Sequence, residues 1–359
     1  MTHFRIHIKN GRIWDGERFF EGNVAIKDGK IAALGDTGDF NCSFTYDAEG
    51  AIVSAGLVDI HTHLRYLSDP VYETNGEQAC FPCGVTSAAD GGTKYRSSHP
   101  QTSLLRTKLF VPVSIRNGVP IFSRIEEMRE YYGERVMGVK AYFDKSMIGD
   151  CGAETFGQIC EYAHSQGLKV MVHCTDSPTP MSDMMSCMSE GDICTHAYHG
   201  VGHTASEDNF GCLRYAKECG IILDTGFADG YHTDFDILKK AIELGLGPDT
   251  VSTDLTSAAA RMYGSAFGMT LAMNTARALG MNETELMRAV TSCAARAAGF
   301  EAPVGYLRVG EAADVCVLDY GNYYGEMKDR NGRILEITQG YKCLLTVSDG
   351  DVVYRSDLK

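Results

Sequence analysis

The stretch Gly56-Leu-Val-Asp-Ile-His61-Thr-His63 joins a short apolar run to two histidines that are one residue apart. The run has the length of a buried strand, and side chains alternate between the two faces of a strand. His61 and His63 therefore point to the same side, where both imidazoles can reach one metal ion. For this pair alone, an exposed strand with two solvated histidines is the alternative.

Short apolar runs of the same kind recur through the middle of the chain, with segments of helix length between most of them. Besides residues 56–60, the candidate strands are 84–88, 109–113, 136–140, 168–172, 192–195, 220–223 and 250–253. Parallel strands that alternate with helices close into a barrel. The sequence therefore predicts an α/β fold, a (β/α)8 barrel of the TIM type, over residues 55–303.

Several of the intervening segments carry helix start and stop signals. An apolar stripe over residues 156–163 stops at Gly167, as is typical of a helix that ends at a glycine. Asp234 precedes a second stripe and is expected to cap it. Ser123 with Glu126 fits a capping box, and Asn282 with Glu285 is expected to open a helix that closes at Gly299.

Both ends of the chain indicate β structure. Turn-forming pairs at Asn10-Gly11, Asp28-Gly29 and Asp349-Gly350 lie between alternating or apolar runs and predict hairpins. Neither end has enough strands for a stable sheet alone. We therefore expect residues 1–54 and 304–359 to pair into one small composite β-sandwich domain.

Composition and charge exclude several classes of protein. The net charge is −14, and the 33 Lys and Arg residues form no cluster that would suit a nucleic acid. No run of apolar residues is long enough to span a membrane, and the first residues lack the pattern of a signal peptide. The 13 cysteines, including Cys80-Phe-Pro-Cys83, form no disulfide or metal framework. We expect reduced thiols in a cytoplasmic protein that binds neither nucleic acid nor membrane.

Further metal-ligand candidates lie where other predicted strands end. Lys140, His173, His196 and Asp254 follow the fourth, fifth, sixth and eighth runs. The carboxyl ends of barrel strands meet at one face, where barrel active sites lie. The sequence therefore predicts that these side chains converge with His61 and His63. The alternatives are separate polar residues of the core or rim and, for Lys140, an ordinary salt bridge.

This pattern resembles the amidohydrolase superfamily, in particular its dihydroorotase-like and amidohydrolase-deacetylase branch, over nearly the whole chain. Gly310-Glu-Ala-Ala-Asp314 is also similar to the segment by which such proteins return to their small β domain. The resemblance implies a centre of two divalent metals in which His61, His63 and Asp254 bind the first ion. It further implies that His173 and His196 bind the second, and that Lys140, carboxylated by CO2, bridges both.

The resemblance also implies the chemistry. A buried lysine has its pKa lowered, by up to ~3–5 units in documented cases, and its neutral amine can then react with CO2. Imidazoles with hard oxygen donors suit Zn2+, with manganese, iron, cobalt and nickel as alternatives. Two such ions would convert a shared water into hydroxide. Asp254 would be the catalytic residue that takes up its proton and passes it to the leaving group.

Substrate contacts are predicted at Arg65, Tyr142, His199 and Ser257. Arg65 stands where a dihydroorotase-like His-x-His-Leu-Arg run holds a substrate carboxylate, with a rim salt bridge as the alternative. The chain departs from dihydroorotases at Asp90-Gly-Gly-Thr93, where they carry an asparagine. It departs from the deacetylase group at residues 224–228, which read Asp-Thr-Gly-Phe-Ala. His203 and His232 are interpreted as solvated loop residues.

The expected function is hydrolysis of a small, carboxylate-bearing amide, either cyclic as in dihydroorotase or N-acyl. An ester or O-acetyl hydrolase with the same site is one alternative, and a catalytically inactive barrel that serves as a binding or assembly subunit is another. The partner is then a small molecule. By analogy with such relatives, the chain could also form a homo-oligomer.

Overall fold

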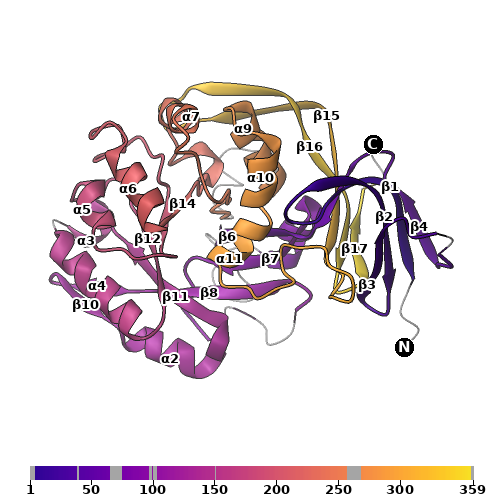
Figure 1. Cartoon of the computed structure of the whole chain (residues 1–359). Helices are drawn as coiled ribbons and strands as arrows, with labels where there is room; N and C mark the ends of the chain where they lie inside the picture. Colours follow the sequence, from indigo (N-terminus) through magenta and orange to yellow (C-terminus); the bar gives the residue numbers. More distant parts are fainter. Residues whose placement is uncertain are drawn as a thin grey trace.

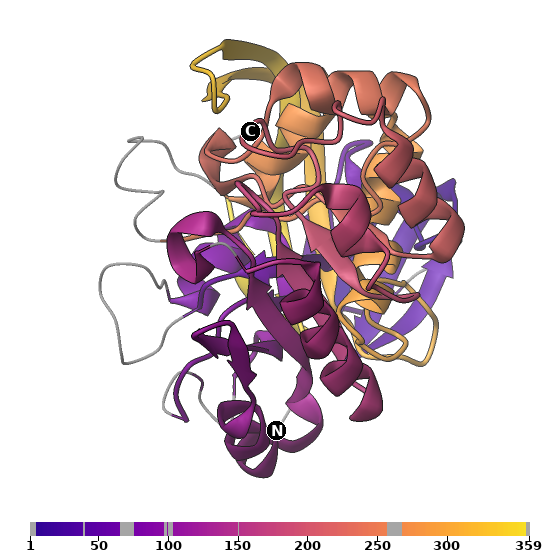
Figure 2. The ribbon, with the colours of Figure 1, turned by 90° about the vertical axis from the view of Figure 1, so that its left-hand side faces the viewer.

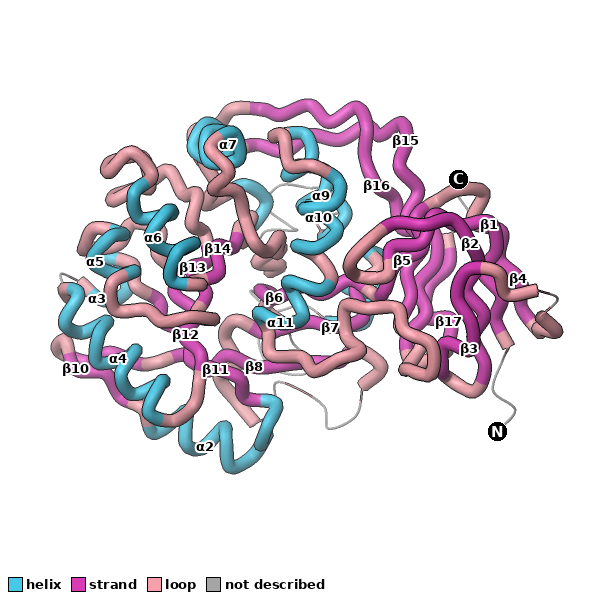
Figure 3. The backbone as a smooth tube through the Cα atoms, in the orientation of Figure 1, coloured by secondary structure: helices cyan, strands magenta, loops and turns pink. Residues whose placement is uncertain are grey.

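The computed structural model describes residues 5–38, 40–64, 75–96, 99, 103–149, 151–256 and 268–356. It has two parts, a curled parallel sheet surrounded by helices and a second sheet built from both chain ends (Figure 1). Figure 3 shows the helices gathered around the parallel sheet. None of the described helices is both long and apolar enough to cross a membrane.

The parallel sheet has seven strands in the order β14-β13-β12-β11-β8-β7-β6. Their bounds are Leu57–Thr62 for β6, Val85–Asp90 for β7, Arg106–Pro112 for β8, Val136–Tyr142 for β11, Lys169–His173 for β12, Ile193–Thr195 for β13 and Ile222–Asp224 for β14. Each corresponds to a predicted strand. A small hairpin, β9 (Ser114–Arg116) with β10 (Val119–Ile121), follows β8.

The predicted eighth strand is an extended segment that makes only single parallel bridges, Asp224 to Thr250 and Thr62 to Leu255. It nevertheless lies between β14 and β6. The Asp254 amide donates to the His61 carbonyl at 2.7 Å, and the His63 amide donates to the Leu255 carbonyl at 3.0 Å. Asp254 has a positive φ of 51°, which interrupts the regular ladder. The segment therefore bridges the two edges of the sheet without forming a regular strand.

Helices follow the strands around the outside of the parallel sheet. Their bounds are Gly76–Cys80 (α1), Ser123–Tyr132 (α2), Lys145–Ile148 (α3), Ala153–Ser165 (α4), Met181–Met185 (α5), Gly211–Cys219 (α6), Phe235–Glu243 (α7), Met269–Ala278 (α9), Glu283–Ala289 (α10) and Ser292–Ala297 (α11). Short 3-10 turns lie at Phe81–Cys83 (η1), Gly133–Arg135 (η2) and Ala228–Gly230 (η3).

Two of the predicted helix signals are confirmed. Helix α4 buries the stripe from Phe156 to Ala163, and Gly167 follows it with a φ of 67°. The Asp234 side chain caps α7 by accepting hydrogen bonds from the amides of Asp236 and Ile237. Both helix signals depend only on residues within a few positions of the helix end. The sequence alone could therefore predict these two helix ends.

Two helix predictions need correction. Ser123 does not cap α2, because Phe122 occupies the N-cap position, where its ring stacks on Tyr162 at 3.8 Å between centroids. Asn282 does cap α10, by accepting from the Glu285 amide. The helix does not run on to Gly299, however, because Thr291 leaves the helical conformation. The Thr291 hydroxyl donates to the Met287 carbonyl and accepts from the buried Trp14 indole.

The second sheet has the order β17-β16-β15-β5-β1-β2-β3, with β4 paired to β1. Its strands are Ile6–Trp14 (β1), Phe19–Lys27 (β2), Lys30–Gly35 (β3), Phe44–Asp47 (β4), Ile52–Ala55 (β5), Val315–Lys328 (β15), Ile334–Ser348 (β16) and Asp351–Arg355 (β17). It has an apolar core of its own, built from both chain ends. The fold class predicted from the sequence is thereby confirmed, while the exact domain boundaries stay a prediction.

The predicted hairpins have different outcomes. Asp28-Gly29 joins β2 to β3, and Asp349-Gly350 joins β16 to β17, as expected. The hairpin at Asn10-Gly11 is wrong, because both residues lie inside β1 at a shift of its register with β2. Asn10 takes a φ of 55° there, and a Cβ on Gly11 would lie 2.4 Å from Val53. The pair thus forms a bulge, which requires the same residue types as a tight turn.

Strands β15 and β16 form a long hairpin that reaches from the second sheet to α7 (Figure 1). In the rotated view of Figure 2 this hairpin projects at the top of the molecule. Helix α9 packs along β16 beneath it. The hairpin therefore joins the second sheet to the far side of the barrel.

Candidate metal centre

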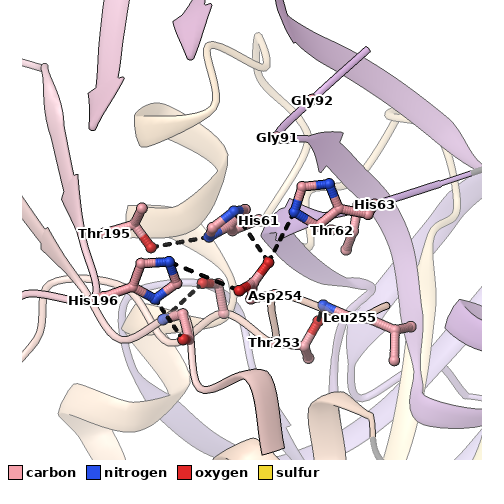
Figure 4. Close-up of polar contacts among 12 residues, drawn as sticks. His61, Thr62, His63, Gly91, Gly92, Thr195, His196, Thr253, Asp254 and Leu255 are labelled. Atoms are coloured by element: carbon pink, nitrogen blue, oxygen red, sulfur yellow. Dashed lines mark hydrogen bonds and ion pairs between the residues drawn. The ribbon is translucent and has the colours of Figure 1, made fainter. Parts of the chain in front are cut away.

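His61 and His63 lie at the carboxyl end of β6 and face Asp254 (Figure 4). The Oδ1 atom of Asp254 lies 2.9 Å from His63 Nε2 and 3.3 Å from His61 Nε2. One candidate ligand atom from each of the three residues lies within 4.8 Å of the others. The structure thus brings together the three residues predicted for the first metal.

A chain of hydrogen bonds fixes the His61 ring. Thr195 Oγ1 donates a hydrogen bond to Asp224 Oδ2 at 2.7 Å. Because its own proton is used in this bond, Thr195 Oγ1 can accept a hydrogen bond from His61 Nδ1 at 2.9 Å. Burial raises the pKa of Asp224 to about 6, although hydrogen bonds from Ser252, Thr195 and Thr250 act against this rise. With its proton on Nδ1, His61 directs the lone pair of Nε2 into the centre.

Asp254 lies between the two groups of histidines. Its Oδ2 atom is 3.7 Å from His196 Nε2, on the side opposite to His63. Burial alone would raise the pKa of Asp254, but the hydrogen bond from His63 and the nearby cationic groups hold it below the ordinary value. Asp254 is therefore a carboxylate at neutral pH, as a metal ligand or proton acceptor must be.

His173 ends β12, and His196 follows β13. Their ring centroids are 4.6 Å apart. The Nδ1 atom of His196 donates to the Gly226 carbonyl at 2.7 Å, and its buried Nε2 has no hydrogen-bond partner in the described part of the chain. Burial lowers the pKa of both histidines. Both are therefore neutral imidazoles with a lone pair available.

Lys140 lies in β11 and is completely buried. Its Nζ atom is 2.8 Å from His61 Nε2, and it forms no ion pair with any acidic side chain that the structure describes. Burial lowers the pKa of Lys140 to about 8, although Asp254 and other carboxylates act against this decrease. An amine surrounded by imidazoles is an unusual arrangement for a lysine with a purely structural role.

The predicted centre opens into a cavity of about 590 Å3. Its inner end is lined by His61, His63, Lys140, His173 and Asp254. Neutral imidazoles, a carboxylate and a lysine that can become an anionic ligand are a donor set that fits divalent metals such as Zn2+. The buried Nε2 of His196 also needs a partner of this kind. The residues present therefore fit the metal centre that the sequence predicts.

His232 is the residue that sequence reasoning missed. Only 9% of it is exposed, and its ring centroid lies 4.1 Å from that of His196. Interpreting it as a solvated loop residue was wrong. Its position two residues before the Asp234 cap was a usable signal, because helices that follow barrel strands begin near the active-site face. His203, in contrast, lies on the surface beside Glu207.

The candidates for substrate contacts are only partly brought to the cavity. Tyr142 lines it, and its hydroxyl donates to the Gly91 carbonyl at 3.3 Å. His199 is completely buried and, among the described residues, is not part of the cavity wall. Burial lowers its pKa to about 4. Arg65 and Ser257 lie outside the described residues.

The two glycines after β7 leave room for the centre. A Cβ on Gly91 would lie 2.4 Å from His61 Cδ2, and one on Gly92 would lie 2.7 Å from the Tyr142 hydroxyl. Asp90 holds this turn by accepting from the Gly92 amide at 3.0 Å. The Asp90-Gly-Gly-Thr93 run that distinguishes this chain thus serves the close approach of backbone to a histidine.

Cys80 and Cys83 lie in α1 and η1 and form no metal cluster among the described residues. Burial raises the pKa of both thiols. Because their pKa values are raised, neither thiol is an activated thiolate.

Parallel strands around a centre of histidine, lysine and aspartate at their carboxyl ends define the class of TIM-barrel hydrolases. Within that class, the profile of the amidohydrolase family matches residues 52–353, and the chain belongs to this family. The resemblance seen in the sequence is thereby confirmed.

Individual relatives agree with this assignment. A deacetylase of Enterococcus faecalis is 25% identical over 96% of this chain and 98% of its own length. A dihydroorotase of Methanosarcina acetivorans is 28% identical over 54% of this chain and 43% of its own length. Among solved structures, a dihydroorotase superposes with a TM-score of 0.85 at 22% identity, covering 98% of this chain and 99% of that one. An adenine deaminase gives 0.82 at 21%, covering 98% and 100%.

Proposed function

We propose that this chain is a metal-dependent hydrolase that cleaves a small, carboxylate-bearing amide. The observation that carries the proposal is the meeting of six side chains at or just after the carboxyl ends of the barrel strands: His61, His63, Lys140, His173, His196 and Asp254. His61, His63 and Asp254 would hold one divalent ion and His173 and His196 a second, with Zn2+ as the expected metal. When bound, two such ions would supply a water of lowered pKa and polarise a carbonyl.

Lys140 is proposed to bridge the ions as a carbamate. Because its pKa is lowered to about 8, part of the lysine is a neutral amine at physiological pH. The amine nitrogen attacks the carbon of CO2, a C–N bond forms, and one proton leaves to solvent. The product is an anion with two oxygen donors. It would bind the divalent ions, which an ammonium group would repel.

Asp254 is proposed to be the catalytic proton carrier. Its carboxylate reaches both groups of histidines, and its lowered pKa keeps it ready to accept a proton. Asp254 would accept a proton from the attacking water. It would then return this proton to the departing nitrogen of the amide.

The cavity wall supports a substrate with a carboxylate and an apolar part. Lys94 and Arg124 both line the cavity, and the Arg124 guanidinium donates to the Lys94 backbone carbonyl at 3.1 Å. Val113, Ile115, Met147 and Ile148 supply apolar surface. In a chain of net charge −14, two basic side chains at the site favour an anionic ligand.

The relatives named as deacetylases support an N-acyl substrate, such as an N-acetyl amino acid. The same name also fits an O-acetyl ester, which is the second candidate because the same centre can attack either carbonyl. The dihydroorotase and allantoinase relatives support a cyclic amide less strongly, since they match only 54% of this chain.

The test is an assay of the purified chain against N-acetyl amino acids, dihydroorotate, hydantoins and O-acetyl esters, with metal content measured on the same sample. We expect bound metal, hydrolysis of one of these classes, and loss of activity with a chelator that Zn2+ restores. A well-folded chain that binds no metal and hydrolyses none of them would favour an inactive barrel that serves as a binding subunit.

A further inference from the structure

His232 lies beside the two histidines predicted for the second metal, although the pattern of strand ends does not include it. We propose that His232 is a third imidazole ligand of the His173 and His196 position, and that the tip of the β15–β16 hairpin holds it there. The proposal rests on the proposed function only in requiring that the centre binds metal.

The three rings are arranged as a metal site requires. One nitrogen from each of His173, His196 and His232 lies within 4.8 Å of the others. The His232 ring centroid is 4.1 Å from that of His196 and 4.9 Å from that of His173. Three protein donors that leave an open position are typical of catalytic zinc sites.

The polar atoms of these rings are buried without protein partners. Neither His196 Nε2 nor His232 Nδ1 has a hydrogen-bond partner among the described residues. The other nitrogen of His232 is 3.8 Å from Asp254 Oδ2, beyond hydrogen-bond length. Buried polar atoms are normally satisfied, so unsatisfied ring nitrogens on two neighbouring buried histidines indicate a ligand that the described residues do not supply.

The backbone carries His232 inward and fixes it from two sides. The Phe227 and Ala228 amides donate to the carbonyls of Ser252 and Thr253, at 3.2 and 2.8 Å. On the other side, the Gly200 amide donates to the His232 carbonyl at 3.3 Å. His232 is therefore held between the segment that precedes Asp254 and the segment that follows His196.

The hairpin tip, residues 328–333, contacts the neighbours of His232 directly. The Arg330 amide donates to the Thr233 carbonyl at 3.0 Å, and the Arg330 guanidinium lies 4.6 Å from the centroid of the Tyr231 ring. Asn331 Nδ2 donates to Asp234 Oδ2 at 2.6 Å. The residues on both sides of His232 thus contact the same hairpin residue.

The fit between the tip and this loop is close. A Cβ on Gly230 would lie 1.9 Å from the Lys328 carbonyl oxygen. Asp329 shapes the tip by accepting from the amides of Asn331 and Arg333 at 2.9 and 2.8 Å. Arg330 and Asn331 are therefore positioning residues, which act on the metal through His232.

The first experiment compares His232→Ala and the more conservative His232→Gln with the control His203→Ala, a half-buried loop histidine that pairs with Glu207. Metal-free protein is titrated with Zn2+ against a chromophoric chelator, and Co2+ spectra are recorded. We expect both His232 variants to keep one tight ion and to bind the second at least about 10-fold more weakly, with a changed Co2+ spectrum. His203→Ala should match the unmodified chain.

Two ions bound by both His232 variants with unchanged affinity and spectrum would overturn the ligand role while leaving the proposed function intact. A folded unmodified chain that takes up no metal would overturn both. Thermal unfolding of the metal-free forms shows whether each variant is folded before the titration is interpreted.

The second experiment tests the hairpin with Arg330→Ala combined with Asn331→Ala, against the control Glu326→Gln on the exposed side of the same hairpin. We expect the double variant to weaken only the second ion, by about 10-fold, since residues that orient metal ligands have effects of this size. Equal affinities for both ions in the double variant and the control would overturn the positioning role.

Discussion

The two halves of the metal centre are built in different ways. His61 and His63 stand on one strand, and Asp254 is hydrogen-bonded to that strand through its backbone. On the other side, only His173 ends a strand, while His196 and His232 stand on loops. The first half thus follows from strand geometry, whereas the second depends on contacts with distant segments. A histidine on a loop is thus positioned by contacts with other segments, such as the bond from His196 to the Gly226 carbonyl, rather than by strand geometry.

The largest effect on kcat is expected from a change at Asp254, the residue that lies between the two halves of the centre. Asp254→Asn should lower kcat about 10²–10⁴-fold, because the amide cannot carry the proton. Steady-state kinetics with the substrate found for the chain measure this loss. Asp351→Asn, on the exposed strand β17, is the control. An unchanged kcat in Asp254→Asn would remove this residue from the chemistry.

The strand-built half is tested by Thr195→Val. This change removes the acceptor for His61 Nδ1 and a hydrogen-bond donor to Asp224. We expect the affinity of the first ion to fall about 10–100-fold. Chelator competition measures it, with Thr204→Val as the control. Weakening of the second ion instead would show that the two halves are not independent.

The two basic residues of the cavity wall, Lys94 and Arg124, test substrate binding alone. Lys94→Ala and Arg124→Ala should raise KM for carboxylate-bearing substrates about 10-fold and leave kcat nearly unchanged, as expected for an interaction that is equal in ground and transition states. Arg116→Ala, a cation that is not among the residues lining the cavity, is the control. Equal effects on an uncharged substrate would argue against a carboxylate contact.

The smallest effect is expected on the free energy of unfolding, in a comparison of two helix caps. Asp234→Ala and Asn282→Ala should each cost about 1 kcal/mol of unfolding free energy, because each cap accepts amide hydrogen bonds. Chemical denaturation measures this cost. Only Asp234→Ala should also weaken the second ion, because Asp234, two residues after His232, accepts a hydrogen bond from Asn331 of the hairpin tip. The same weakening in Asn282→Ala would point to general loosening of the fold.

The sequence predicted the residues on strands correctly but missed a residue on a loop. His61, His63 and Lys140 could be placed because side-chain direction on a strand follows from residue spacing. His232 could not, because its burial depends on the hairpin tip, almost a hundred residues further along the chain. The hairpin predicted at Asn10-Gly11 was wrong for a related reason. Its residues suit a turn and a bulge equally, and pairing with β2 decides between them.

The helix ends show the same limit. Asp234 and Asn282 cap helices by contacts within three residues, which sequence can show. The break after α10 arises instead because Thr291 binds Trp14, from the other end of the chain. Likewise, Phe122 displaces the predicted Ser123 cap while it stacks on Tyr162. Long-range partners override local preference at each of these points.

The turn at Gly91 and Gly92 limits how the pocket can be altered by mutation. Any side chain at position 91 meets the His61 ring, which β6, Thr195 and Lys140 all hold in place. At position 92 the nearest obstacle is the far end of the Tyr142 side chain, and a Cβ there would also lie 3.2 Å from His63 Nδ1. A library of variants should therefore keep glycine at 91 and accept small residues at 92 together with changes at 142. Altered substrate preference is thus more accessible through this pair than through the strand ends.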